Sequence, residues 1–280
     1  MKKIWGYIAV TLFFAAGALL ALAYLRSGSV PQPSPWAGGE IRVGYSSEPP
    51  YAFRTPAGEV TGVGPETAKA VLGRLGNPRI RWVLLDFGQA LAALEAGQID
   101  LLANGLFITP ERAGRVLFSL PYARVGQGLL VRQGNPRKLA SYEDVAAAPD
   151  VIAAVLDGSV EETALLAMGL PRQRLFVVPD PGAGLAAVRS GRADCLALSG
   201  PTVRWLAGES QGEAEEARPF AQPTALPAGE SAFALRKADA RLAEAINDAL
   251  RDVVGSQDLA ARLEPLGFGR QNLPLWSLSR

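Results

Sequence analysis

Residues 99–112 combine side chains that could hold a small anion. The apolar residues 99–103 predict a short buried strand, and Thr109-Pro110-Glu111 has the composition of a helix start, with threonine as the cap. Arg112 follows in the first turn, where its planar guanidinium could pair with a carboxylate beside the threonine hydroxyl. Phe107 lies on the loop between, next to that charge. A core phenylalanine and a solvated helix arginine are the alternative interpretation.

Two further segments carry groups suited to a small charged ligand. Pro49 and Pro50 predict a stiff loop that presents Glu48 and Tyr51. The segment Asp157-Gly158-Ser159-Val160-Glu161 predicts the start of another helix, whose exposed backbone amides could hold an anion. An ordinary helix cap explains that segment equally well.

Strands and short helices alternate along the chain. Strands are predicted at 41–45, 80–85, 99–103, 129–132, 151–156, 175–178, 193–198 and 231–235. Helices are predicted at 64–75, 89–96 and 239–254, with others beginning near 141 and 159 and one ending at 190. This alternation indicates βα units and mainly parallel sheets, which present ligands at the carboxyl ends of their strands.

The composition disfavours most enzyme chemistries. The 280 residues include no histidine and one cysteine, so a His/Cys metal site, a histidine-dependent triad and an intrachain disulfide are excluded. Cys195 lies in an apolar strand pattern and is predicted to be a small core residue. With a net charge of +1 and no long basic run, a nucleic-acid surface is not expected. No cofactor and no metal are expected.

Two related lobes are predicted from an internal repeat. Residues 91–103 align without gaps on residues 185–197, and both segments show a helix pattern, a Gly-x-x-Asp step and an apolar strand. The last strand and helix are predicted to return to the first lobe, so the chain would cross between lobes near 122–128 and 221–231. Two crossings form a hinge, with the ligand in the cleft between the lobes.

The N-terminal 39 residues are predicted to lie outside the fold. Lys2 and Lys3 precede an apolar run from Ile4 to Leu25, which is about long enough to span a bilayer and also resembles a signal peptide. A Pro/Ser/Gly spacer follows and predicts a tether. The folded part is therefore expected in the periplasm or otherwise outside the cytoplasm, either secreted or anchored by this helix.

The chain resembles the type II periplasmic solute-binding proteins of ABC importers, in the polar-amino-acid group. The resemblance covers roughly residues 40–270 and rests on motifs that occur in a fixed order. These are Glu48-Pro49-Pro50-Tyr51, Thr61-Gly62, Pro65-Glu66, Gly97-Gln98-Ile99-Asp100, Ile108-Thr109-Pro110-Glu111-Arg112, Phe118-Ser119-Leu120-Pro121-Tyr122, Gly158-Ser159 and Gly191-Arg192-Ala193-Asp194. It implies an α/β fold of two lobes, each a mainly parallel sheet flanked by helices, joined by a two-strand hinge.

The resemblance implies residue limits and partners. Residues 40–124 and 228–270 would form lobe 1, residues 125–227 lobe 2 and residues 271–280 a C-terminal tail. The expected partners are a small solute and an importer permease, for a protein that acts as a monomer, is not an enzyme and binds no nucleic acid.

Within the group, the sequence is most similar to the ectoine and hydroxyectoine binders. By position, Tyr51, Phe87 and Phe107 would form an aromatic box, with Glu48 on the ligand's cationic ring. Arg112 would bind the carboxylate, with Thr109 beside it and with Gly158 and Ser159 contributing from the second lobe.

One departure from the group concerns the ligand class. Amino-acid binders usually carry an aspartate just after the Gly-Arg-x-Asp strand, to hold the α-ammonium, whereas this chain has Leu198-Ser199-Gly200 there. A delocalised ring cation suits aromatic faces, at about 0.5–2 kcal/mol per contact. A zwitterion without a primary ammonium is therefore favoured, and Ser199 becomes a candidate site residue.

Three alternatives stay open. The first is a polar amino-acid-binding protein of an ABC importer. The second is a cyclohexadienyl-dehydratase-like enzyme that uses Glu48 as its acid, for which the sequence offers one proton donor and no second. The third is a sensor ectodomain, which would need a separate signalling partner.

Overall fold

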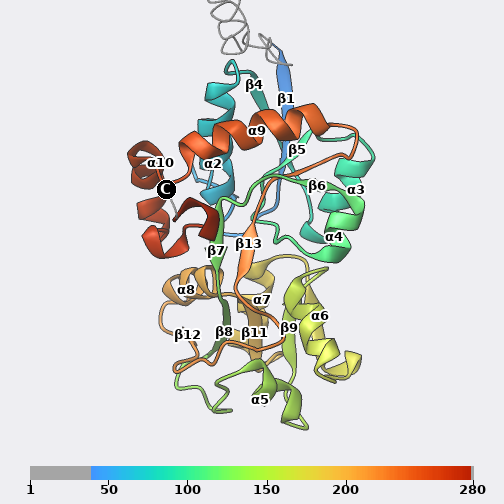
Figure 1. The fold of residues 1–280 in the computed structure, drawn as a ribbon. Helices are drawn as coiled ribbons and strands as arrows, with labels where there is room; N and C mark the ends of the chain where they lie inside the picture. Colours follow the sequence, from blue (N-terminus) through green and yellow to red (C-terminus); the bar gives the residue numbers. More distant parts are fainter. Residues whose placement is uncertain (1–38, 279–280) are drawn as a thin grey trace, which may run out of the picture. The chain divides into compact units, whose positions relative to one another are not determined.

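The computed structural model describes residues 39–278 (Figure 1). The predicted signal or anchor segment and nearly all of the spacer lie outside the described residues. Among the residues that are described, no helix is both long and apolar enough to cross a bilayer.

The first sheet has the strand order β4 (Arg79–Leu84), β1 (Glu40–Tyr45), β5 (Leu101–Leu102), β14 (Ala234–Leu235) and β6 (Leu117–Phe118). Successive strand residues point to opposite faces, so Leu101 packs toward α2 (Val63–Arg74), α9 (Ala240–Val253) and α10 (Gln257–Leu263). Leu102 packs on the other face, toward α3 (Ala90–Glu95). The sheet is thus apolar on both faces, as a helix-covered α/β sheet requires.

The second sheet repeats this arrangement with the order β10 (Leu175–Val178), β9 (Ala153–Leu156), β11 (Cys195–Ser199), β8 (Gln127–Arg132) and β12 (Ala214–Glu216). One face packs on α5 (Tyr142–Ala147) and α6 (Val160–Ala167), the other on α7 (Pro181–Ser190) and α8 (Gly200–Glu209). Cys195 is fully buried in this sheet, which fits its predicted role as a core residue.

Both sheets are mainly parallel, as predicted. In the first, β4, β1 and β5 run parallel, and β14 is antiparallel to both β5 and β6. In the second, β10, β9 and β11 run parallel, and β8 is antiparallel to both β11 and β12. Each antiparallel strand comes directly after a crossing between the lobes, so the crossing chain enters its new sheet in the reverse direction.

Two strands, β7 (Ala123–Val125) and β13 (Gly229–Ser231), form the predicted hinge (Figure 1). They pair antiparallel, with Val125 opposite Gly229 and Ala123 opposite Ser231. The two crossings are therefore hydrogen-bonded to each other.

The internal repeat corresponds to a shared structural role. Asp100 Oδ2 accepts a hydrogen bond from the backbone N–H of Arg42 on β1, at 3.1 Å. Asp194 Oδ2 accepts one from the N–H of Ile152 just before β9, at 2.9 Å. In each lobe, the aspartate of the Gly-x-x-Asp step thus satisfies an amide at the start of the neighbouring parallel strand.

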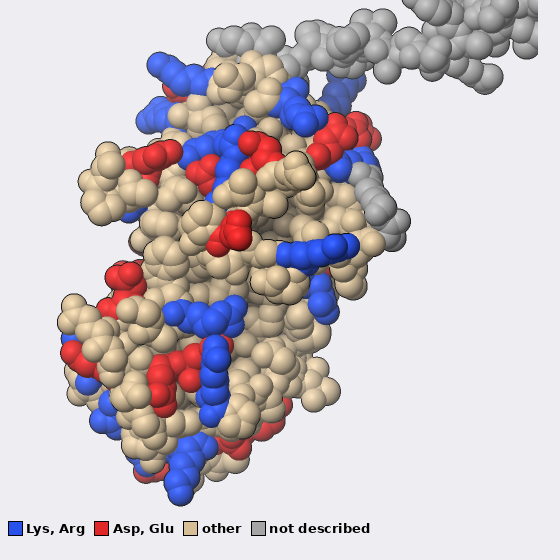
Figure 2. All heavy atoms as spheres, turned by 90° about the vertical axis from the view of Figure 1, so that its left-hand side faces the viewer, with Lys and Arg blue, Asp and Glu red and all other residues tan. Residues whose placement is uncertain are grey.

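Several elements were not predicted. They are α8, β6, β12, α10, the short pair β2 (Phe53–Arg54) and β3 (Val60–Thr61), and the 3₁₀ turns η1 (Phe87–Gln89), η2 (Arg172–Arg174), η3 (Glu264–Leu266), η4 (Arg270–Asn272) and η5 (Leu275–Ser277). Most are too short for a hydrophobic period to be recognised. Figure 2 shows basic and acidic side chains interspersed on the face that carries α8 and α10, in keeping with ion pairs such as Arg204–Glu216 and Arg218–Glu216.

Candidate functional site

A small cavity lies between the two lobes and gathers most of the predicted site residues. Its volume is about 30 Å³, close to the space of a single water molecule. The predicted residues in its lining are Glu48, Tyr51, Phe87, Phe107, Arg112, Ser159 and Ser199. Gly105, Leu156, Val160, Glu161 and Leu198 complete it.

Arg112 lies in this cavity at the start of α4 (Pro110–Arg115). The helix begins as predicted, because the Thr109 side chain accepts a hydrogen bond from the Arg112 N–H at 3.2 Å. Arg112 is 8 % exposed, and the central carbon of its guanidinium lies 5.9 Å from the centroid of the Phe87 ring. Burial lowers the pKa of Arg112, although a guanidinium remains charged at any physiological pH.

The guanidinium of Arg112 also connects the two lobes. Nη1 donates to the Phe107 carbonyl in lobe 1 at 2.9 Å, and Nη2 donates to the Gly158 carbonyl in lobe 2 at 2.9 Å. An arginine has five N–H donors, so these bonds leave capacity for a carboxylate. Arg112 therefore links the position of a bound anion to the approach of the lobes.

Thr109 and Gly158 do not line the small cavity. Both line a larger cleft of about 570 Å³ beside it, which shares Phe87, Arg112, Ser159 and Val160 with the cavity. The Gly158 N–H donates to Glu162 Oε2 at 3.0 Å, so this amide is occupied by the chain's own carboxylate. The predicted contact of these two residues with a ligand stays a prediction.

Glu48 follows β1 on the loop with the two prolines and is 7 % exposed. Thr202 Oγ1 of α8 donates to Glu48 Oε1 at 3.1 Å, which forms a second contact between the lobes. Burial and the nearby Glu161 carboxyl raise the pKa of Glu48 to about 8, against the opposing effects of Thr202 and Arg112. Near neutral pH this carboxyl therefore carries a proton for much of the time.

Glu161 is the residue that the sequence interpretation missed. It was treated as part of a helix start, and the helix does begin there, with Ser159 as its cap. Glu161, however, is only 4 % exposed. Its side chain lines the cavity from lobe 2, whereas Glu48 lines it from lobe 1. Burial raises the pKa of Glu161 to about 7. Glu161 comes two residues after Ser159, at the helix start whose backbone amides were predicted to hold an anion. This position was the sequence signal that could have identified Glu161 as a site residue.

The predicted aromatic trio is present in the lining. Tyr51 is 2 % and Phe107 is 8 % exposed, while Phe87 is half-buried. Phe107 packs on the hinge at Gly229, where an added Cβ would lie 2.4 Å from the Phe107 Cδ2 atom. The buried Tyr51 hydroxyl is near Ser199 but has no hydrogen bond of normal geometry to any residue from 39 to 278. That hydroxyl is available to a ligand.

The lobes also approach each other closely at Gly88. A Cβ added there would lie 2.3 Å from Asp157 Oδ2, and the Gly88 Cα is 3.5 Å from the position of a Cβ on Gly158. Any side chain at Gly88 would therefore meet the second lobe.

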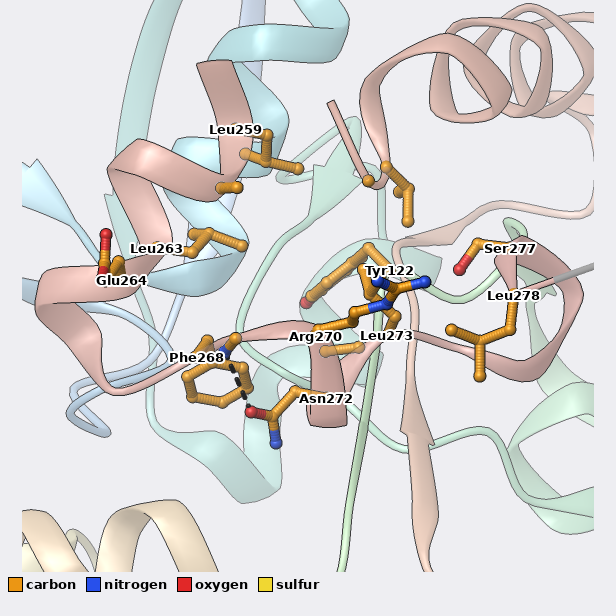
Figure 3. Close-up of a pocket in the computed structure, with 15 residues that line it drawn as sticks. Tyr122, Leu259, Leu263, Glu264, Phe268, Arg270, Asn272, Leu273, Ser277 and Leu278 are labelled. Carbon is orange, nitrogen blue, oxygen red and sulfur yellow. Dashed lines mark hydrogen bonds between the residues drawn. The ribbon is translucent and has the colours of Figure 1, made fainter. Parts of the chain in front are cut away.

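A second pocket lies on lobe 1, beneath the C-terminal residues (Figure 3). Its volume is about 450 Å³, and Leu259, Leu263, Phe268 and Leu273 form much of its apolar wall. Two charged side chains, Glu264 and Arg270, line it, and both residues are exposed. It lacks the buried charges that distinguish the cavity between the lobes.

The cavity can bind charged groups by direct pairing. It combines one guanidinium, two carboxyl groups and three aromatic rings, which suits the charged groups of a small solute that carries both a carboxylate and a cation. At about 30 Å³ the cavity must widen, or open into the adjoining cleft of about 570 Å³, to admit the whole solute. Within residues 39–278, no group of three or more Cys, Asp or Glu side chains is arranged to hold a metal ion.

Comparisons with known proteins agree with a solute-binding fold. The family model described as bacterial extracellular solute-binding proteins, family 3, matches residues 41–265. The probable amino-acid ABC transporter periplasmic-binding protein y4tE of Sinorhizobium fredii is 33 % identical over 260 residues, which are 91 % of this chain and 85 % of that protein.

Two solved structures are similar to the chain. The crystal structure of EhuB in complex with hydroxyectoine is 30 % identical, with a TM-score of 0.78, over 86 % of this chain and 92 % of that one. The ancestral amino acid-binding protein AncCDT-1, a precursor of cyclohexadienyl dehydratase, is 28 % identical, with a TM-score of 0.71, over 81 % of this chain and 95 % of that one.

Proposed function

The chain belongs to family 3 of the bacterial extracellular solute-binding proteins, and we propose that its solute is a small zwitterion of the ectoine type. Membership of this family, with relatives among amino-acid ABC transporters, means that it binds a small solute outside the cytoplasm for an importer permease. Such a protein binds and releases its solute without chemical change. The proposal concerns which solute that is.

The observation that supports an ectoine-like zwitterion is the set of side chains that line the cavity between the lobes. Arg112 is available for a carboxylate, Glu48 for a cation, and the rings of Tyr51, Phe87 and Phe107 lie in the same lining. Aromatic faces attract a delocalised cation more readily than a compact, strongly hydrated ammonium. The similarity to EhuB, whose structure contains hydroxyectoine, agrees with this proposal.

An α-amino acid is the second candidate, and Glu161 favours it. The presence of Ser199 in place of the group's usual aspartate disfavours an amino acid. Glu161, however, brings a carboxyl to the same cavity from the second lobe. This carboxyl could pair with an α-ammonium. The two candidates therefore differ in what Glu161 contacts.

Calorimetry of the purified protein separates these candidates. Ectoine and hydroxyectoine should bind more tightly than glutamine, arginine or lysine. The variant Ser199→Asp, which restores the group's acid, should shift the preference toward amino acids. Nanomolar binding of a common amino acid by the wild type, without heat from ectoine, would replace the first candidate by the second.

The enzyme alternative gains a second proton donor, since Glu48 and Glu161 both have a raised pKa. We propose that the protein nevertheless binds its solute without converting it. An assay for turnover of a ring acid, of the kind that a cyclohexadienyl-dehydratase-like enzyme would convert, should show no product.

We further propose that it acts as a monomer, secreted or held at the membrane by residues 4–25. The predicted lobe limits, residues 40–124 with 228–270 and residues 125–227, are part of this proposal.

A further inference from the structure

We propose that Glu161 is a specificity-determining residue, and that a zwitterionic solute is bound together with one proton shared by Glu48 and Glu161. The inference rests on the proposed function, because it concerns the same cavity. It adds a means by which the net charge of the solute is selected.

The cavity contains more acidic groups than basic ones. Two carboxyl groups, Glu48 from lobe 1 and Glu161 from lobe 2, share it with the single guanidinium of Arg112. All three residues are less than 9 % exposed. A zwitterion brings one anion and one cation, which pair with Arg112 and with one carboxylate. The other carboxylate is left without a counter-charge.

An unpaired carboxylate in so small a cavity is unfavourable. Removing an ion from water without a partner costs far more than burying the neutral acid, so such a group takes up a proton. Because the two carboxyl groups influence each other, the proton belongs to the pair and not to either residue.

The groups around the pair supply no second cation. The charged and titratable side chains that interact electrostatically with it are Arg112, Tyr51, Tyr122 and Tyr142, with Glu111 beside Arg112. Burial raises the pKa of all three tyrosines, so they stay neutral over the working range of pH. For the described part of the chain, Arg112 is the one cation that acts on either carboxyl.

The pKa values of the pair agree with this charge balance. Burial raises the pKa of Glu48 to about 8 and that of Glu161 to about 7. The pair therefore exchanges protons close to neutral pH. The buried Tyr51 hydroxyl, which lies near Ser199 without a hydrogen bond of normal geometry to any residue that the structure describes, is of a type that can donate to an ionised carboxylate or accept from a protonated one.

The consequence is a maximum in affinity for a zwitterion. Below about pH 7 both carboxyl groups are protonated, so binding must release one proton; above about pH 8 both are ionised, so binding must take one up. On either side, the affinity should fall by up to about tenfold per pH unit. A solute of net charge +1 can use both carboxylates, so its affinity should rise with pH and then level off.

Calorimetry provides the test, with ectoine as the zwitterion and L-arginine as the monocation. Titrations of the purified protein from pH 5.5 to 9.5, in two buffers of different ionisation enthalpy, count the protons exchanged. For ectoine we expect about one proton released at pH 6 and about one taken up at pH 9. For arginine we expect no uptake at pH 9.

The variant Glu161→Gln removes one member of the pair. It should abolish proton uptake at pH 9 and the fall in ectoine affinity above pH 8, and it should weaken arginine relative to ectoine. Glu143→Gln, an exposed acid in the first turn of another lobe 2 helix, is the control and should keep the wild-type profile.

Thermal melting without solute gives an independent measurement. A carboxyl with a raised pKa in the folded protein stabilises it fully below the unfolded value near 4.5 and loses that effect as the pH rises through 7 to 8. The wild-type melting temperature should therefore decline over this range, and Glu161→Gln should decline less.

Two results would overturn the inference. One is ectoine binding with no proton exchange and a flat pH profile. The other is a Glu161→Gln variant with the wild-type fall at high pH. Absence of ectoine binding at every pH is a different result, which overturns the proposed ligand class and this inference with it.

Discussion

The cavity between the lobes and the pocket beneath the C-terminal residues differ in volume and in charge. The first has about 30 Å³ and buries Glu48, Glu161 and Arg112. The second has about 450 Å³ and an apolar wall, and its Glu264 and Arg270 are exposed (Figure 3). Buried charge is costly for folding, whereas apolar burial is stabilising. The smaller site therefore carries the stronger indication of binding.

This comparison predicts opposite effects of substitution. Changes in the cavity should weaken solute binding, because its charged groups are the ones available to pair with the opposite charges of a solute. Changes around the C-terminal pocket should lower the free energy of unfolding and leave affinity unaltered. Four substitutions examine this separation.

The largest effect is expected for Arg112→Ala. It removes the buried cation that we propose pairs with the solute carboxylate, and it should cost about 3–5 kcal/mol of binding free energy by calorimetry. Arg74→Ala on α2 is the control, because Arg74 is exposed, pairs with Asp252 and lies outside the lining of both the cavity and the adjoining cleft. Its affinity should stay within twofold of wild type. The same small change in Arg112→Ala would contradict the site assignment.

The next effect is expected for Phe107→Ala. Loss of cation–π attraction and of packing on Gly229 should weaken an ectoine-like zwitterion by about 1–3 kcal/mol, measured by calorimetry. Phe176→Ala serves as control, because that ring contacts Arg192 on the second lobe, outside the cavity lining. Equal losses for both variants would mean that destabilisation, and not the aromatic wall, weakens binding.

Gly88→Leu tests the approach of the lobes. A leucine there must displace Asp157 or hold the lobes apart, so affinity should fall about tenfold, or about 1.4 kcal/mol. The control is Gly73→Leu on α2, where an added Cβ has no atom within 4 Å. Small-angle scattering should show less contraction on binding for Gly88→Leu than for the control. Wild-type affinity with full contraction would contradict the close approach seen here.

The smallest effect is expected for Trp276→Phe near the C-terminal pocket. The Trp276 indole N–H donates to the Pro121 carbonyl at 2.9 Å, and its loss should cost about 0.5–1.5 kcal/mol of unfolding free energy in a denaturant titration. Solute affinity should stay within twofold of wild type. A tenfold change in the solute affinity of Trp276→Phe would mean that the C-terminal pocket also influences binding. That result would contradict the separate roles of the pocket and the cavity.

The sequence predicted the architecture well because its hydrophobic periods and helix starts are local signals. Thr109, Ser141 and Ser159 cap helices as their positions indicated, and the repeated Gly-x-x-Asp step has the same role in both lobes. Short elements such as β12 have too few residues to show a period.

The site was predicted less completely, for a physical reason. Whether an acid such as Glu161 is solvated or buried depends on which surface folds opposite it, and that surface comes from the other lobe. The contact between Thr202 and Glu48 joins residues 154 positions apart, beyond the reach of any local pattern. The side chains that adjoin the cleft from lobe 2 were therefore the hardest to identify.

The paired strands β7 and β13 give the hinge a direction-dependent stiffness. A ribbon of two hydrogen-bonded strands resists stretching and in-plane shear, because both motions break N–H···O bonds. It bends out of its plane by small changes in φ and ψ. The lobes can therefore move by bending or twisting of this ribbon, and since Phe107 packs on Gly229, such a motion would displace the aromatic ring together with the backbone. Opening the cleft should therefore loosen the ring's contact with a solute from the first degrees of bending.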